Sequence, residues 1–169
     1  MYPLSFAQER LWFIEQYEEG ARAYHSSVIL RLLPEVSEKQ LENALTAIIG
    51  RHEVLRSRFV ETEWGQGQIV DEGEISFSHI ICETEGDCRE QLKAVIHRPF
   101  DLRKEWPLRI VFYETSSEQE RYLLFVFHHV AWDGWSMNVL LQELLAYYHQ
   151  ESLPALSIQY KDFAVWQRQ

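Results

Sequence analysis

The chain has 169 residues, a length that fits one domain or one lobe of a larger unit. Its 26 acidic and 16 basic residues give a net charge of -10, which disfavours nucleic acids and anionic membranes as partners. The longest apolar run, residues 122–127, is far too short to span a membrane, and the acidic N-terminal segment lacks the cationic start of a signal peptide. We therefore expect a soluble, cytoplasmic protein.

Hydrophobic periodicity and helix-capping signals predict the elements in chain order. Ser5 with Gln8, and Ser37 with Gln40, have capping-box spacing, and Gly20 is expected to end the first helix. Helices are predicted over residues 5–18, 37–50, 88–96, 136–149 and 159–169, and strands over 27–33, 55–61, 66–71, 75–81, 108–114 and 121–128. The elements do not alternate as in a doubly wound parallel sheet, so an α+β sandwich is the expected class.

The two cysteines, Cys82 and Cys88, are separated by five residues. This spacing fits neither a CxxC redox pair nor a zinc site. In a reducing cytosol two free thiols are expected, and neither cysteine is given a role.

The run from His128 to Gly134 carries the strongest chemical signal. It follows an apolar strand and precedes Ser136 and an amphipathic helix, which places an imidazole at the mouth of a cleft. Adjacent strand residues point to opposite faces, so one histidine is expected to act and the other to support it. Asp133 would either orient the ring or pair with an arginine from another element, and Gly134 permits a close backbone approach or a positive φ.

Two simpler interpretations of this run stay open on the residues alone. The histidines would end an ordinary strand beside an Asp-Gly turn with Ser136 as a helix cap. A metal site is the weaker rival, because His129 and Asp133 lie four apart and spacing suggests no third ligand. The five other histidines are expected to be ordinary surface or core residues.

Four segments, in order, resemble the motifs of the condensation domains of nonribosomal peptide synthetases. They are Leu4–Phe13, Arg51–Phe59, His128–Ser136, which fits the HHxxxDG pattern, and Tyr160–Trp166. Ser57 stands where threonine is commoner, and Glu105 and Trp106 stand where a glycine is usual. The resemblance implies a chloramphenicol-acetyltransferase-like sandwich, of which residues 1–169 form only the N-terminal subdomain. The resemblance thus implies that the C-terminal subdomain is not included in these residues, and more protein is expected after Gln169.

The resemblance also implies a reaction and its partners. Such domains join a donor acyl or peptidyl thioester to the amine of an aminoacyl thioester, forming an amide bond. The substrates would arrive on the phosphopantetheine arms of upstream and downstream peptidyl carrier domains, with no directly bound cofactor and no metal. The missing C-terminal lobe would be a further partner.

Each residue of the motif receives a role from the same resemblance. His129 would face the tunnel and orient or deprotonate the attacking amine, and His128 would be a packed support. Asp133 would form a structural ion pair with Arg56, and Gly134 would leave room for the pantetheine arm.

Three alternatives accompany this interpretation. The chain would belong to an acyltransferase that moves an acyl group from a carrier or coenzyme A to a small amine or alcohol. It would belong to an epimerising or cyclising relative, although a cyclising one should carry aspartate in place of His128. Or the isolated lobe would be an inactive folding or docking unit, because one lobe cannot close a tunnel.

Overall fold

The computed structural model describes residues 1–17, 24–63, 65–116 and 120–169, and Gly20, predicted to end the first helix, lies outside these ranges. The helices are α1 (Phe6–Tyr17), α2 (Glu38–Arg51), the 3-10 helix η2 (Glu53–Arg56), α3 (Glu85–His97), α4 (Ser136–Tyr148) and α5 (Tyr160–Gln167). The strands are β1 (Tyr2–Pro3), β2 (His25–Leu32), β3 (Ser57–Thr62), β4 (Gly65–Val70), β5 (Ser78–Cys82), β6 (Leu108–Thr115) and β7 (Glu120–His128).

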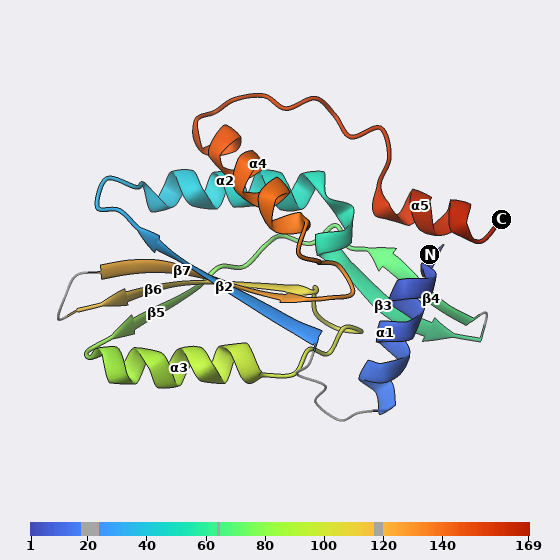
Figure 1. The fold of residues 1–169 in the computed structure, drawn as a ribbon, viewed down its shortest axis with the longest axis horizontal. Helices are drawn as coiled ribbons and strands as arrows, with labels where there is room; N and C mark the ends of the chain where they lie inside the picture. The colour runs from blue at the N-terminus through green and yellow to red at the C-terminus, as the bar shows by residue number, and fades with distance from the viewer. Residues whose placement is uncertain (18–23, 64, 117–119) are drawn as a thin grey trace.

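A four-stranded sheet in the order β2-β7-β6-β5 lies at the centre of the fold. β2, β7 and β6 are antiparallel, and β5 joins the edge parallel to β6. Helix α3 covers one face and α2 and α4 cover the other (Figure 1). The expected α+β sandwich is therefore confirmed, with a mixed sheet between helical layers.

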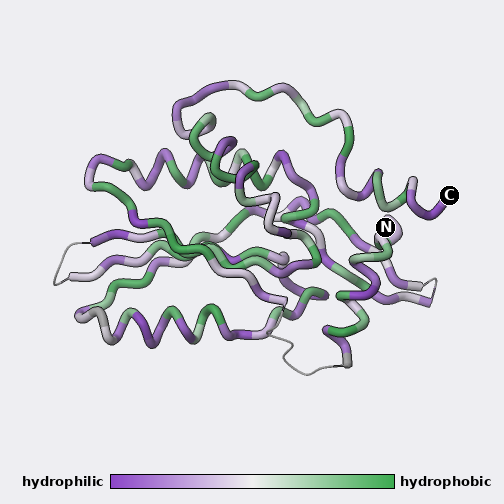
Figure 2. The backbone as a smooth tube through the Cα atoms, viewed as in Figure 1, coloured by the Kyte–Doolittle hydropathy of each residue, from purple (hydrophilic) through white to green (hydrophobic). Residues whose placement is uncertain are grey.

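Strand β7 is buried on both faces, which explains its unbroken apolar run. Phe125 and Phe127 face the cluster that includes α2 and α4. Leu124 and Val126 face the cluster that includes α3. The hydropathy colouring shows apolar chain concentrated along the central strands (Figure 2). His128 therefore lies on the same face of β7 as Leu124 and Val126. Continued alternation would place His129 on the opposite face.

Helices α2 and α4 are joined by charged groups at the C-terminal end of α2. Glu143 accepts hydrogen bonds from Arg51 Nε at 2.9 Å and from His52 Nε2 at 2.6 Å. Gln159 donates to the Arg51 carbonyl at 2.9 Å, which ties the segment before α5 to the same corner. His52 at this corner and Ser136 at the start of α4 line the same cavity.

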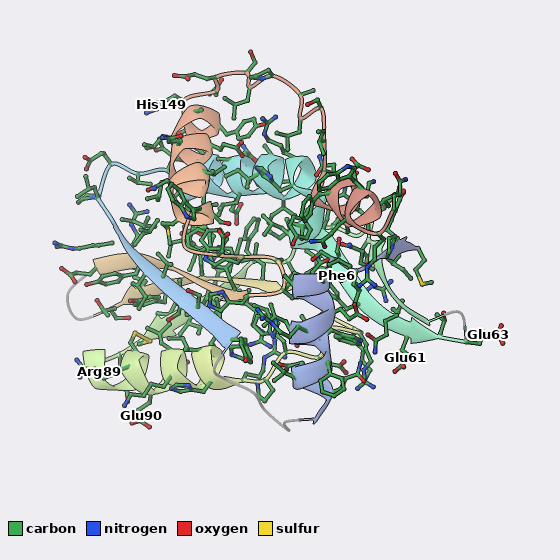
Figure 3. The ribbon with its side chains drawn as sticks, turned by 45° about the vertical axis from the view of Figure 1, so that its right-hand side comes forward. Phe6, Glu61, Glu63, Arg89, Glu90 and His149 are labelled. Atoms are coloured by element: carbon green, nitrogen blue, oxygen red, sulfur yellow. A yellow bond between two sulfur atoms is a disulfide. The ribbon has the colours of Figure 1, made fainter. Side chains whose placement is uncertain are left out.

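A second sheet, in the order β1-β4-β3, packs beside α1 and α5. The predicted capping box is present: Gln8 N–H donates to Ser5 Oγ at 3.1 Å, and Ser5 N–H donates to Gln8 Oε1 at 3.0 Å. Glu61 and Glu63 mark the hairpin end that projects from the body, and Arg89 and Glu90 lie on the outer side of α3 (Figure 3).

Three predicted boundaries were wrong for local reasons. Residues 55 and 56 belong to η2 and not to the strand, since the Leu55 N–H donates to the His52 carbonyl at 3.0 Å. The strand predicted from residue 75 begins at Ser78. Helix α3 begins at residue 85 because Thr84 caps it, accepting a hydrogen bond from the Asp87 N–H.

The prediction of two free thiols was wrong. Cys82, at the end of β5, forms a disulfide with Cys88, in the first turn of α3, with a Cα–Cα distance of 5.3 Å. Linear spacing did not reveal this contact, because the turn through Thr84 folds the start of α3 back over β5. Both sulfur-bearing side chains are at most 2% exposed.

Reduction of this disulfide is expected to lower the free energy of unfolding by about 2 kcal/mol, since a short closed loop constrains the unfolded chain modestly. Urea unfolding with and without a phosphine reductant measures the difference. The Cys82→Ser/Cys88→Ser double variant is the control, because the reductant should leave its midpoint unchanged. A reductant effect of equal size in that variant would contradict the assignment.

Candidate active site

The motif turn connects β7 to α4 and is held by backbone hydrogen bonds. The His129 N–H donates to the Tyr24 carbonyl at 2.9 Å, and the Ala131 N–H donates to the His128 carbonyl at 3.0 Å. Trp132 is buried and its ring stacks on Phe127 with centroids 3.6 Å apart. The turn is therefore fixed on the core just before and just after the two histidines.

The His129 side chain is half-buried beyond the end of β7. Its Nδ1 lies 3.0 Å from the carbonyl oxygen of Trp132, and a carbonyl oxygen only accepts, so Nδ1 carries the proton in this contact. Nε2 of the neutral ring is then the atom with a lone pair. Among the described residues Nε2 has no hydrogen-bond partner, so it is available to accept a proton or an N–H from a substrate.

His128 points the other way, into the layer shared with α3, and is fully buried. Its Nδ1 accepts a hydrogen bond from the Val130 N–H at 3.1 Å, and its Nε2 lies 3.2 Å from Glu15 Oε2. The ring of Phe100 meets it edge-on at 5.8 Å. The structure thus places one histidine at the surface and one inside.

The predicted ion pair between Asp133 and Arg56 does not form. Asp133 is exposed, and its Oδ1 accepts from the Ser136 N–H at 3.0 Å and from Ser136 Oγ at 2.7 Å. Arg56 donates from Nη1 to the Asp71 carbonyl at 2.6 Å, while its Nε is buried without a partner among the described residues. The carboxylate is satisfied three residues away along the chain, a local contact that outcompetes the longer-range pair.

Removal of the Asp133 side chain in Asp133→Ala is expected to cost about 1 kcal/mol of unfolding free energy near neutral pH, because Ser136 at the start of α4 loses its two hydrogen bonds to this carboxylate. The Ser136 hydrogen bonds lower the pKa of Asp133 below its usual 3.8. A depressed pKa stabilises the fold above the unfolded-state value, so the difference between wild type and variant should shrink as pH falls below 3.8. Urea unfolding between pH 3 and 7 measures it, and a pH-independent difference would contradict the expectation.

Gly134 lies in open space. A Cβ built on it would meet no atom within 4 Å, and its φ is not positive. Neither close packing within the described chain nor backbone strain therefore requires glycine at this position.

Sequence reasoning missed the groups that surround His128. Glu15 and Gln8, both on α1, reach the motif: Gln8 Nε2 donates to the Val130 carbonyl at 3.3 Å. His25 is paired with His128 in the β2–β7 register, with ring centroids 5.8 Å apart, and burial lowers its pKa below 6.5. The spacing of Gln8 indicated only a helix cap, and nothing in the sequence linked α1 to residue 128.

A small apolar cavity of about 160 Å³ lies beside the turn, lined by His52, Leu55, Ala131, Trp132, Ser136 and Val139 among others.

Within the described ranges, the side chains of Glu38, Glu42 and His79 lie close enough together to hold a metal ion. They belong to α2 and β5 and not to the motif turn. No helix of the described chain has the length and apolar character needed to cross a membrane.

Comparison with known proteins identifies relatives along the whole chain. The family profile described as Condensation domain matches residues 1–169. A nonribosomal peptide synthetase, TES, of Alternaria alternata is 38% identical over 98% of this chain and 3% of its own length. The X-domain in its complex with OxyB from teicoplanin biosynthesis superposes with a TM-score of 0.87 at 29% identity, covering 99% of this chain and 38% of that one.

The condensation domain of the Monacolin K polyketide synthase MokA shares the fold, with a TM-score of 0.85 at 21% identity over 99% of this chain and 38% of that one. The chain therefore spans well under half of each of these relatives, and its fold is part of the chloramphenicol-acetyltransferase-like arrangement. With its motif turn, its fold and a family profile that matches from the first residue to the last, the chain belongs to the condensation domain family of nonribosomal peptide synthetases.

Proposed function

We propose that residues 1–169 are the N-terminal subdomain of a condensation domain that forms an amide bond between two carrier-bound substrates. The donor would be an acyl or peptidyl thioester and the acceptor an aminoacyl thioester, each on the phosphopantetheine arm of a peptidyl carrier domain. The domain itself would bind no cofactor. The observation that carries this proposal is the half-buried His129 ring. Its Nδ1 donates to the Trp132 carbonyl, and its Nε2 has no partner in the part of the chain that the structure describes, so it can meet an amine.

In the proposed reaction the acceptor nitrogen attacks the donor thioester carbon. The N–C bond forms, the C–S bond breaks, and the thiol of the donor arm leaves with a proton. His129 Nε2 would accept a hydrogen bond from the amine and so orient the lone pair of the amine nitrogen. It would then take up the amine proton as the tetrahedral intermediate forms. Open space at Gly134 would admit the pantetheine arm.

The other half of the tunnel would come from a C-terminal subdomain. Trp135 and Val139, beside the motif turn, are 83% and 45% exposed, and Trp166 on α5 is 69% exposed. Apolar side chains of this size in such a position fit a surface that another lobe covers. We therefore expect the 169-residue chain alone to form no amide.

A cytoplasmic location belongs to the same proposal, since the carrier domains that would supply the substrates must share a compartment with this domain. There the Cys82–Cys88 disulfide would meet the glutathione pool. Its burial limits attack by a thiolate, which requires access to a sulfur atom.

Mass spectrometry of the product formed by the protein that carries this chain, supplied with loaded donor and acceptor carrier domains, tests the function. Amide product on the acceptor carrier is expected. Free amines or alcohols with a coenzyme A thioester, offered in parallel, test for a small-molecule acyltransferase. Turnover with the free substrates and none with the carrier-bound pair would overturn the condensation proposal.

A further inference from the structure

Both polar backbone groups of Val130, the residue after His129, are held by side chains. Its N–H donates to His128 Nδ1 at 3.1 Å, and its carbonyl accepts from Gln8 Nε2 at 3.3 Å. Gln8 is 1% exposed and is itself fixed by the capping box with Ser5. Helix α1 is therefore hydrogen-bonded to the turn at Val130, next to the proposed catalytic residue His129.

The hydrogen bond from Val130 also determines the protonation of His128. Because a backbone N–H only donates, Nδ1 must be the unprotonated nitrogen, and the proton of the neutral ring is on Nε2. That N–H faces Glu15 Oε2 at 3.2 Å, and the Glu15 side chain is only 8% exposed. Glu15 thus accepts the hydrogen bond from Nε2–H of His128. This contact favours the tautomer in which Nδ1 is unprotonated and can accept from the Val130 N–H.

We propose that Glu15 is a positioning residue for His129, acting through His128 and the backbone of Val130. This inference rests on the proposed function for its effect on catalysis, but the chain of contacts is a property of the fold alone. Without an acceptor at residue 15, the Nε2–H of this fully buried ring loses the partner that it has among the described residues. The ring then turns or changes tautomer, the Val130 N–H is released, and the turn that orients His129 loosens.

The test compares Glu15→Met, which removes the acceptor at similar volume, with Glu15→Gln, whose amide oxygen still accepts. In the whole protein that carries this chain, supplied with carrier-bound substrates, Glu15→Met is expected to lower kcat for amide formation at least tenfold, with KM for both carriers within twofold. Glu15→Gln should restore kcat to within about threefold of wild type. Gln16→Met, an exposed change on the same helix, controls for the helix itself.

A spectroscopic measurement on the 169-residue chain follows the contact directly. The scalar coupling between the Val130 amide nitrogen and His128 Nδ1, across their hydrogen bond, should be present in wild type and Glu15→Gln and lost in Glu15→Met. Retained coupling in Glu15→Met would overturn the tautomer link whatever the activity. Lost coupling with unchanged kcat would overturn the positioning role. If the wild-type form of the whole protein that carries this chain makes no amide, the proposed function fails, and the coupling in the 169-residue chain still decides whether Glu15 controls His128.

Discussion

Substitution of His129 by alanine is expected to lower the rate of amide formation by roughly 10²- to 10⁴-fold, the range typical for loss of a positioned acid–base group. The ring has one hydrogen bond within the described chain and is half-buried, so its removal should change the free energy of unfolding by less than about 1 kcal/mol. Single-turnover measurements on the whole protein that carries this chain, with loaded carrier domains, report the rate, and urea unfolding of the 169-residue chain reports the stability.

Rates must be compared at matched carrier concentrations, because a variant that binds its carriers poorly would imitate a chemical defect. Asn138→Ala, an exposed change in the first turn of α4, serves as the matched control near the motif turn. A wild-type rate in His129→Ala would show that His129 is not a catalytic residue.

His128→Ala is expected to give the opposite result, a large loss of stability. The substitution leaves the Glu15 carboxylate and the Val130 N–H without their shared partner in a fully buried position. Breaking a buried, hydrogen-bonded contact of this kind costs about 3 kcal/mol or more. Urea unfolding of the 169-residue chain measures the loss.

His128→Asn offers the matched control, because the Asn Oδ1 stands close to the position of Nδ1 and still accepts from Val130. It should recover part of the lost stability. Equal stability of the alanine variants at 128 and 129 would show that the two neighbouring histidines do not differ in structural role.

Most of the fold was predictable because its elements have clear local signals. The stripe on α2, the capping box at Ser5, the N-cap at Ser37 and the apolar run of β7 each determine an element through nearby residues. The box predicted at Ser37 is only half formed, because the Ser37 N–H donates to the Tyr148 hydroxyl at 2.9 Å. The errors occurred where tertiary contacts decide. Leu55 has strand-like neighbours but lies in a 3-10 turn, and the disulfide depends on how α3 returns over β5.

The site was predictable only in part for the same reason. Alternation along β7 indicated that His128 and His129 face opposite ways, and the structure places them so. The partner of Asp133 was assigned through resemblance, whereas Ser136, three residues away, satisfies it. Glu15 lies 113 residues from His128 along the chain. Hydrophobic periodicity relates only nearby residues, so it could not predict this contact.

The contacts between α1 and α5 have a consequence for synthesis on the ribosome. Phe6 N–H donates to Gln167 Oε1 at 2.9 Å, Arg168 Nε donates to the Leu4 carbonyl at 2.9 Å, and the Ser5 and Tyr160 hydroxyls are 3.0 Å apart. Such contacts close a loop of nearly the whole chain, which is entropically costly and slow. A nascent chain can therefore make these contacts between its first and last helices only after residue 168 has left the exit tunnel.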